Sequence, residues 1–309
     1  MHSDGLVPLA GGFSGETFAA EVAGERVVAR VYAGRGARRG AEAAAIDAAV
    51  LQLVRGLLPV PQVLELRRPD PAAGTPAVLV TTFLPGERLD ILLPGLGAAA
   101  RRQAGRGLGQ VLGRLAQMPM PRAGQFADAS QRIEPWDTGG GLQAWVRGLR
   151  AESALARWPE PEYRGLLAVA AAAQDRLDQI SRSSLVHSDF NPKNLLIDPA
   201  SGELTGLLDW EFAHAGMPVT DLGNLLRFDR EPVFAGAVLD GYLEVAGHLD
   251  GLAGLTPAAA RDLLLDRARA ADLLALSELA GRRGENPVAG RADAQLRAIA
   301  ASGDLHAQA

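Results

Sequence analysis

Two polar segments, each joined to a short apolar run, constrain the fold of this chain more than any other feature. The first runs from His187 to Asn194 and leads into apolar residues 195–197, and the second runs from Asp209 to Glu211 and follows apolar residues 204–208. The sequence Asp-Pro-Ala-Ser-Gly between the two runs is typical of a turn. The pattern therefore predicts a β-hairpin that brings Asn194 and Asp209 to the same end of neighbouring strands.

The polar residues of these segments are spaced as the transfer of a phosphoryl group from ATP requires. Asp189 can take a proton from an attacking hydroxyl group. The oxygens of Asn194 and Asp209 suit Mg²⁺, which keeps water and substrate phosphates as its other ligands. Taken singly, each residue has an ordinary explanation, such as a turn-forming aspartate or a buried core histidine. The combined spacing favours a kinase instead.

The two motifs also resemble those of a known family. His187-x-Asp189-x4-Asn194, together with Asp209-Trp-Glu211, is similar to the small-molecule kinases that include aminoglycoside and macrolide kinases, choline kinase and fructosamine kinase, relatives of the protein kinases. The resemblance implies an α+β, bilobal protein-kinase-like fold, with a β-rich N-lobe that has one main helix and a mainly helical C-lobe. It implies catalytic roles for Asp189 and His187. The metal ligands would be Asn194 and Asp209.

A further acidic residue fits the same resemblance. Pro218-Val-Thr-Asp221-Leu222 matches the family's Pro-x-x-Asp-Leu pattern, in which the carboxylate supports the catalytic loop and takes no part in the chemistry. An ordinary carboxylate at a helix N-terminus, favoured by the helix dipole, would give the same pattern.

A glycine-rich segment near the N-terminus is the candidate phosphate-binding loop. Its glycines would let backbone amides approach phosphate oxygens, and its hydroxyl groups can add donors. A Gly-Gly-x-x-Gly sequence is also common in a simple hairpin turn. Its place before the strand expected at residues 26–32, and upstream of the catalytic segments, favours phosphate binding. The candidate ligands in this loop are Gly11, Gly12, Ser14, Gly15 and Thr17.

The strand at residues 26–32 carries Arg30 where the protein kinases carry the lysine that holds the α- and β-phosphates. A guanidinium binds phosphate through two donors but differs from an ammonium in reach and geometry. An exposed strand arginine is the alternative interpretation. The helix expected at residues 41–54 should supply an acidic partner, either Asp47, which shares a helical face with apolar residues, or the longer Glu42. The sequence leaves this choice open, and either acid could be an ordinary helix charge.

The nucleotide base should lie at a hinge between two lobes. Residues 77–83 read as a buried strand, and Leu84-Pro-Gly86 follows as the hinge. We expect the adenine to bond the backbone of Thr82, Phe83 and Leu84. Because such recognition does not involve side chains, GTP stays open as an alternative to ATP. The expected division is a nucleotide-binding N-lobe, residues 1–86, and a C-lobe, residues 87–309, with the catalytic loop, the metal site and the acceptor-binding helices.

Composition narrows the class of protein. The 309 residues suffice for two lobes around a sizeable core. The chain has no cysteine, which excludes disulfides and thiolate chemistry. It shows no signal segment at its start and no apolar run of about twenty residues, so we expect a cytoplasmic protein without a membrane span. A net charge of −5 disfavours nucleic acid as a partner.

The acceptor is a small-molecule hydroxyl group whose identity the sequence defines less sharply. An acidic cleft attracts ammonium groups, so we expect a cationic acceptor, with an aminoglycoside-like antibiotic as the leading class. Choline, homoserine, a ketosamine or a macrolide are alternatives, as is a pseudokinase that binds nucleotide without transfer. Most acids of this kind are surface charges, and the oligomeric state is not predicted. The candidate acceptor ligands are Glu211, Asp229 and Glu231, with Asp272 or Glu278 as further possibilities.

Overall fold

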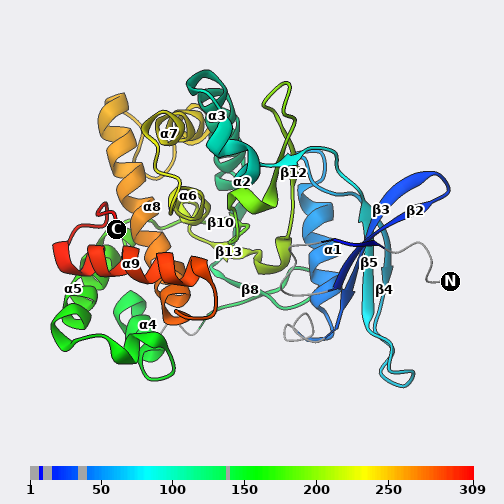
Figure 1. Ribbon diagram of the computed structural model, residues 1–309, viewed down its shortest axis with the longest axis horizontal. Helices are drawn as coiled ribbons and strands as arrows, with labels where there is room; N and C mark the ends of the chain where they lie inside the picture. The colour runs from blue at the N-terminus through cyan, green and yellow to red at the C-terminus, as the bar shows by residue number, and fades with distance from the viewer. Residues whose placement is uncertain (1–6, 10–15, 34–39, 137–139) are drawn as a thin grey trace. The chain divides into compact units, whose positions relative to one another are not determined.

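The computed structural model describes residues 7–9, 16–33, 40–136 and 140–309 (Figure 1). The chain forms two compact units. The strand-rich unit consists of residues 1–104, 124–134 and 187–215, and the helical unit consists of residues 105–123, 135–186 and 216–309.

An antiparallel sheet forms the first part of the strand-rich unit, in the order β1-β2-β3-β5-β4. Its strands are β1 (Val7–Pro8), β2 (Glu16–Val22), β3 (Glu25–Tyr32), β4 (Val63–Arg67) and β5 (Ala77–Thr82). The helix α1 (Ala43–Val54) lies beside this sheet (Figure 1). A hydrogen bond of 2.7 Å from the Tyr32 hydroxyl to Asp47 Oδ2 connects β3 to α1. The predicted strand and helix are therefore present, and the helix begins two residues later than expected.

The predicted β-hairpin is the second part of this unit. Strand β11 (Leu195–Ile197) pairs with β12 (Leu204–Leu207), and the turn between them is closed by backbone amides that bond the Asp198 side chain. On its other side, β11 pairs with β6 (Glu87–Arg88). The remaining elements of the unit are α2 (Leu89–Leu92), η3 (Leu93–Gly95), β8 (Gly124–Phe126), β9 (Ile133–Glu134), η5 (Pro192–Asn194), η6 (Trp210–Phe212) and β13 (His214–Gly216).

The pairing of β6 with β11 explains why the compact units differ from the division expected at residue 86. Because residues 87–88 form a strand beside the hairpin, residues 187–215 group with the first 104 residues of the chain. The division into two functional lobes at residue 86 stays a prediction.

Helices make up most of the helical unit. They are α3 (Ala98–Ala116, of which residues 105–116 belong to this unit), α4 (Gly141–Arg150), α5 (Glu160–Leu177), α6 (Thr220–Leu226), α7 (Pro232–Ala246), α8 (Pro257–Gly281) and α9 (Pro287–Ser302), with the short η4 (Ala154–Arg157). Strand β7 (Pro119–Met120) pairs with β10 (Ser183–Val186). Thr256 caps α8 and a proline opens it. Among the described residues, no helix combines the length and apolar character of a membrane span.

Glycines let α3 pack closely against α7 in the helical unit. Gly105, Gly109 and Gly113 follow one another at a spacing of four and so lie on one face of α3. A Cβ atom added at Gly109 would collide with the carbonyl oxygen of Val238 on α7. Gly107, on another face of the same helix, has no atom within 4 Å of an added Cβ.

We expect Gly109→Ala to lower the free energy of unfolding by about 1–3 kcal/mol, because the new methyl group forces two helix backbones apart. Gly107→Ala is the matched control on the same helix. It should raise the free energy of unfolding by about 0.5–1 kcal/mol through helix propensity alone. Urea titrations of the two variants and the wild type measure the difference, and effects of the same sign would contradict the close packing of α3 on α7.

Candidate functional site

The register of the hairpin brings two predicted metal ligands together. Leu195 lies opposite Leu207, and the Leu208 amide donates a 2.9 Å hydrogen bond to the Asn194 carbonyl. Asn194 and Asp209 therefore leave the same end of the hairpin, as the sequence predicts. Asp209 has a φ of 61°, a left-handed conformation that aspartate adopts more readily than most residues.

The segment before β11 fixes the carboxylate of Asp189. The side-chain amide of Asn194 donates to Asp189 Oδ2 at 2.8 Å and to its carbonyl at 2.9 Å. The amide of Asn191 donates to Asp189 Oδ1 at 2.6 Å, so both carboxylate oxygens are held. Asn194 makes these bonds through Nδ2, and they do not involve its Oδ1, the atom that can bind a cation.

Hydrogen bonds of His187 connect this loop to Leu208, which lies between β12 and Asp209. Its Nε2 lies 2.8 Å from the Leu208 carbonyl, and its Nδ1 accepts a 3.2 Å hydrogen bond from the Asp189 amide. The ring therefore carries its proton on Nε2. Burial lowers the pKa of His187 to about 4, against the weaker opposing effects of the Leu208 carbonyl and the Asp209 charge. These contacts give the neutral ring a positioning role, while the catalytic role expected for His187 stays a prediction.

Arg30, on β3, bonds both acids of the Asp-Trp-Glu motif. Its Nη1 donates to Asp209 Oδ1 at 2.9 Å and its Nη2 donates to Glu211 Oε2 at 2.5 Å. Burial alone would lower the pKa of Arg30, but the surrounding negative charges, with Asp209 the strongest, raise it above its usual value. The guanidinium thus stays charged although it is largely buried.

The two acids that the sequence offers as partners of Arg30 have different neighbours. Asp47 is 3% exposed, accepts a hydrogen bond from Tyr32, and acts by its charge on Arg30. Glu42 instead lies 3.6 Å from Arg68. Of the two candidates, Asp47 therefore acts on Arg30, although the ion pairs of Arg30 are with the Asp-Trp-Glu motif. The nucleotide-binding roles of Arg30 and Asp47 stay predictions.

The sequence does not predict the ion pair of Arg30 with Glu211, because it presents Glu211 only as a candidate acceptor ligand. One signal was available. A guanidinium has a fork of donors that can bond two carboxylates, which the lysine usual at this position cannot imitate.

The expected phosphate loop is described only in part. Gly11, Gly12, Ser14 and Gly15 lie outside the described residues. Thr17 is described, and it lies directly opposite Arg30 in the pairing of β2 with β3. Opposite residues of an antiparallel pair project to the same face, so the last residue of the expected loop shares a face with the expected phosphate-binding cation.

Backbone contacts limit how the expected hinge could bind a base. The amide and hydroxyl of Thr82 both bond the backbone of Gln62, and the Phe83 amide donates to the Arg26 carbonyl. The Leu84 amide has no part in these bonds, so it is the candidate donor of the segment. Gly86, at a φ of 128°, has no room for a Cβ atom beside Thr205. The base-binding role of these residues stays a prediction.

Most candidate acceptor ligands have contacts within the protein. Glu211 is 5% exposed and bonds Arg30. Glu231 caps α7 by accepting hydrogen bonds from the amides of Val233 and Phe234. In the core of the helical unit, Asp272 bonds Arg227. Asp229 is partly buried, Glu278 is exposed, and Asp221 lies buried in the first turn of α6 as expected. Acceptor binding by these acids stays a prediction.

Comparison with known proteins identifies the family. A model of the phosphotransferase enzyme family (APH) matches residues 5–261, more than half of the chain. The chain belongs to this phosphotransferase family. The expectation of a small-molecule kinase is confirmed at the level of the family, and the resemblance drawn from the motifs is confirmed with it.

Solved structures of the same fold agree with this membership. A thermostable mutant of aminoglycoside phosphotransferase APH(4)-Ia, in ternary complex with AMP-PNP and hygromycin B, is 18% identical with a TM-score of 0.65, covering 96% of this chain and 94% of that one. The GDP complex of a mutant aminoglycoside 2'-phosphotransferase-IIIa is 17% identical with a TM-score of 0.68, covering 97% and 92%. At these identities the likeness shows the fold, and it confirms the predicted protein-kinase-like class.

Two further matches come from named organisms. A choline/ethanolamine kinase family protein from Mesorhizobium loti is 18% identical with a TM-score of 0.61, covering 97% of this chain and 88% of that one. Acyl-CoA dehydrogenase family member 10 of Mus musculus is 28% identical over 176 residues, which are 53% of this chain. The match spans only 15% of the length of the mouse protein.

The oxygen donors of this phosphotransferase suit Mg²⁺. Asn194 supplies an amide oxygen and Asp209 a carboxylate, the hard ligands that Mg²⁺ prefers. Among the described residues, no three or more His, Cys, Asp or Glu side chains gather as a metal site. Mg²⁺ seldom needs such a cage, because one or two carboxylates together with substrate phosphates hold it. The donor set therefore fits a metal that is held jointly by protein and nucleotide.

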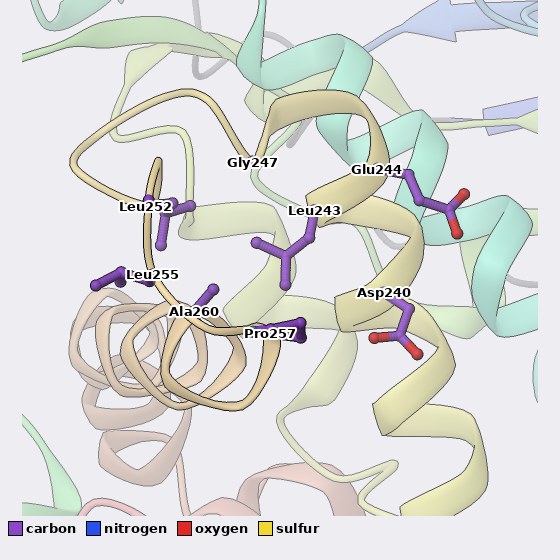
Figure 2. A pocket seen from close by; sticks show the side chains of 9 residues that line it. Asp240, Leu243, Glu244, Gly247, Leu252, Leu255, Pro257 and Ala260 are labelled. Carbon is purple, nitrogen blue, oxygen red and sulfur yellow. The ribbon is translucent and has the colours of Figure 1, made fainter.

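The helical unit of the phosphotransferase also carries an open pocket of about 450 Å³ (Figure 2). Leucines of α7 and of the loop before α8 line it, with Asp240 and Glu244 at its side. Asp240 pairs with Arg261, and Glu244 pairs with Arg106. None of the predicted site residues lines this pocket, and both of its carboxylates are paired with arginines.

We expect the protein to lose stability as the pH falls from 6.5 towards 4, because His187 and His214 are buried. Burial lowers the pKa of each ring to about 4. The unfolded chain therefore takes up protons in this window while the folded protein does not, which favours unfolding. At pH 5 each ring should remove about 2 kcal/mol of the unfolding free energy present at pH 7.

Urea titrations at pH 7 and pH 5 measure this loss. His187→Gln and His214→Gln should each lower the difference between the two pH values by about 2 kcal/mol, whatever they do to stability at pH 7. A pH dependence that both substitutions leave unchanged would assign the acid sensitivity to other groups.

Proposed function

We propose that this phosphotransferase moves the γ-phosphoryl group of Mg²⁺-bound ATP to a hydroxyl group of a small molecule. The observation that carries the proposal is the hydrogen bond between Asn194 and Asp189. It connects the expected catalytic base to Asn194, an expected metal ligand. The partner strand β12 ends at Leu207, two residues before Asp209, the other expected ligand.

Asp189 is proposed as the residue that touches the acceptor. Its carboxylate would accept the proton of the attacking hydroxyl and orient that oxygen towards the phosphorus. The amides of Asn191 and Asn194 hold both carboxylate oxygens, so the group is aimed before any substrate arrives. A fixed base of this kind limits the reorganisation that the reaction needs.

The nucleotide phosphates are proposed to meet Arg30 and the loop from Gly11 to Thr17. When bound, Mg²⁺ would neutralise charge that develops on the phosphate oxygens, and Asn194 and Asp209 would hold it. The base is proposed to bond the backbone between Thr82 and Leu84. Such recognition does not depend on side chains, and one structural relative binds GDP, so GTP remains an alternative to ATP.

An aminoglycoside-like antibiotic is the proposed acceptor class, with antibiotic resistance as the corresponding role and the cytoplasm as the proposed location. Two considerations support a cationic acceptor. The protein carries a net charge of −5, and a structural relative forms a complex with hygromycin B. A choline-like metabolite is the second candidate, because another relative belongs to the choline/ethanolamine kinase family. Homoserine, ketosamines and macrolides are tested beside it.

We expect Asp189→Asn to lower kcat by about 10²–10⁴-fold, because the amide cannot accept the proton of the hydroxyl. Calorimetry should show nearly unchanged Mg-ATP affinity, since Asp189 meets the acceptor and not the nucleotide. Glu203→Gln, an exposed substitution in the same hairpin segment, is the matched control and should leave kcat unchanged. Near wild-type turnover in the Asp189 variant would remove this residue from the mechanism.

A panel of acceptors tests the proposed function directly. Purified protein with Mg-ATP should add the mass of one phosphoryl group to an aminoglycoside, read by mass spectrometry, and the Asp189→Asn variant should not. Transfer to choline, homoserine, a ketosamine or a macrolide alone would replace the acceptor class. Nucleotide binding without transfer to any member of the panel would favour a pseudokinase.

A further inference from the structure

We infer that Arg30 changes partner when nucleotide binds. Its guanidinium is bonded to both Asp209 and Glu211. When nucleotide binds, it releases Asp209 to the metal and turns to the phosphates, while it stays bonded to Glu211. Glu211 is then a positioning residue for Arg30 and not an acceptor ligand. The inference rests on the proposed function, which assigns the phosphates to Arg30 and the metal to Asp209.

Burial decides which acid keeps the guanidinium. The side chain of Glu211 is 5% exposed, whereas that of Asp209 is 29% exposed. A buried carboxylate that loses its cation is strongly unfavourable, because no water replaces the lost partner. Asp209 can exchange its partner, since water and a metal ion can reach it. Glu211 is therefore the fixed partner and Asp209 the exchangeable one.

The donors of the guanidinium allow this exchange. An arginine has five N–H groups, and the two ion pairs use Nη1 for Asp209 and Nη2 for Glu211. The buried Nε of Arg30 has no hydrogen-bond partner among the described residues. Arg30 can thus keep its Nη2 hydrogen bond to Glu211 while its other N–H donors bond a phosphate. A lysine has a single ammonium group and is less suited to hold both partners.

The charges around Arg30 show why a second cation belongs here. Three carboxylates, Asp47, Asp209 and Glu211, act on this one guanidinium. These four described groups sum to a charge of −2, in a cluster whose members are mostly buried. One divalent cation balances that excess. Asp47 is bonded to Tyr32, over whose ring the guanidinium lies, and its charge keeps the guanidinium attracted when Asp209 is released.

Cooperativity between metal and nucleotide follows from the exchange. A metal ion alone must displace Arg30 from Asp209, so it binds the nucleotide-free protein weakly. A nucleotide brings phosphates that accept Arg30 and thereby uncovers Asp209. By linkage, each ligand raises the affinity for the other by the same factor.

Manganese binding to the nucleotide-free protein tests the inference without any turnover. Mn²⁺ is the probe, and free Mn²⁺ is read by electron paramagnetic resonance. Arg30→Met keeps the length of the side chain and removes its charge, so Mn²⁺ should bind about tenfold more tightly than in the wild type. Arg26→Met, on the same strand β3, is the matched control for a general loss of positive charge, because Arg26 stacks on Phe83 and should not alter Mn²⁺ affinity by that factor.

A double substitution guards against misfolding. Arg30→Met leaves Glu211 buried without its cation, so Arg30→Met combined with Glu211→Met replaces the buried pair by apolar groups of similar size, which proteins tolerate well. Asp209 is uncovered in this variant too. We expect the folded double variant, checked by circular dichroism, to bind Mn²⁺ more tightly than the wild type. Equal or weaker Mn²⁺ binding in this variant overturns the inference.

The coupling between ligands supplies the second readout. In the wild type, saturating ATP should tighten Mn²⁺ binding strongly, and in Arg30→Met this factor should shrink about tenfold because Asp209 is already uncovered. An unchanged factor overturns the inference. Failure of the proposed function looks different: Asp209→Asn would then leave Mn²⁺ binding with ATP intact, and no acceptor of the panel would be phosphorylated by the wild type.

Discussion

The register of the β11–β12 hairpin is the constraint on which the proposed site depends. Leu195 opposite Leu207 places Asn194 and Asp209 at one end of two hydrogen-bonded strands. A slip of one residue would turn every side chain of one strand to the other face. The buried leucines and isoleucine of both strands, the turn at Asp198 and the added strand β6 all oppose such a slip. The geometry of the expected metal ligands therefore depends on apolar packing of the two strands as well as on polar contacts such as the turn at Asp198.

Two residues at the same place have a left-handed backbone conformation. Ser188, just before Asp189, has a φ of 69°, and Asp209 has a φ of 61°. Residues in this region cost on the order of 1–3 kcal/mol each and persist only where the surroundings hold them. Here the surroundings are two buried rings. The His187 ring hydrogen-bonds Leu208 and Asp189, the neighbours of the two strained residues, and its centroid lies 4.6 Å from that of Trp210. The neutral histidine is thus part of what holds two strained residues in place, which explains a buried polar side chain at this position without giving it a part in proton transfer.

The parts of the site that the sequence predicts are those whose geometry is local. Asp189, Asn194 and Asp209 lie on one loop and one hairpin, so their spacing in the chain nearly determines their spacing in space. The contact of Glu211 with Arg30 could not be predicted, because the two residues are 181 positions apart and no periodicity indicates a contact of that range. Asp47 and Glu42 could not be separated either, because only the packing of α1 against β3 decides which acid is buried beside Tyr32. The strands expected at residues 26–32 and 77–83 and the helix expected at residues 41–54 needed no such distant information, because their apolar patterns are local.

The acceptor is less well defined than the reaction, because acceptor binding depends on contacts between residues that are distant in the sequence. Phosphoryl transfer needs a base and hard oxygen ligands in a fixed arrangement, which a short motif can encode. Acceptor binding needs charges from several elements, and in a sequence these look like any other acids. The structure accounts for three of them by other means: Glu231 caps a helix, Asp272 bonds a buried arginine, and Glu211 bonds Arg30. Each acid that already caps a helix or pairs with an arginine weakens an acceptor assignment that is based on counting carboxylates. The case for a cationic acceptor therefore depends on the overall charge more than on the number of acids near the motif.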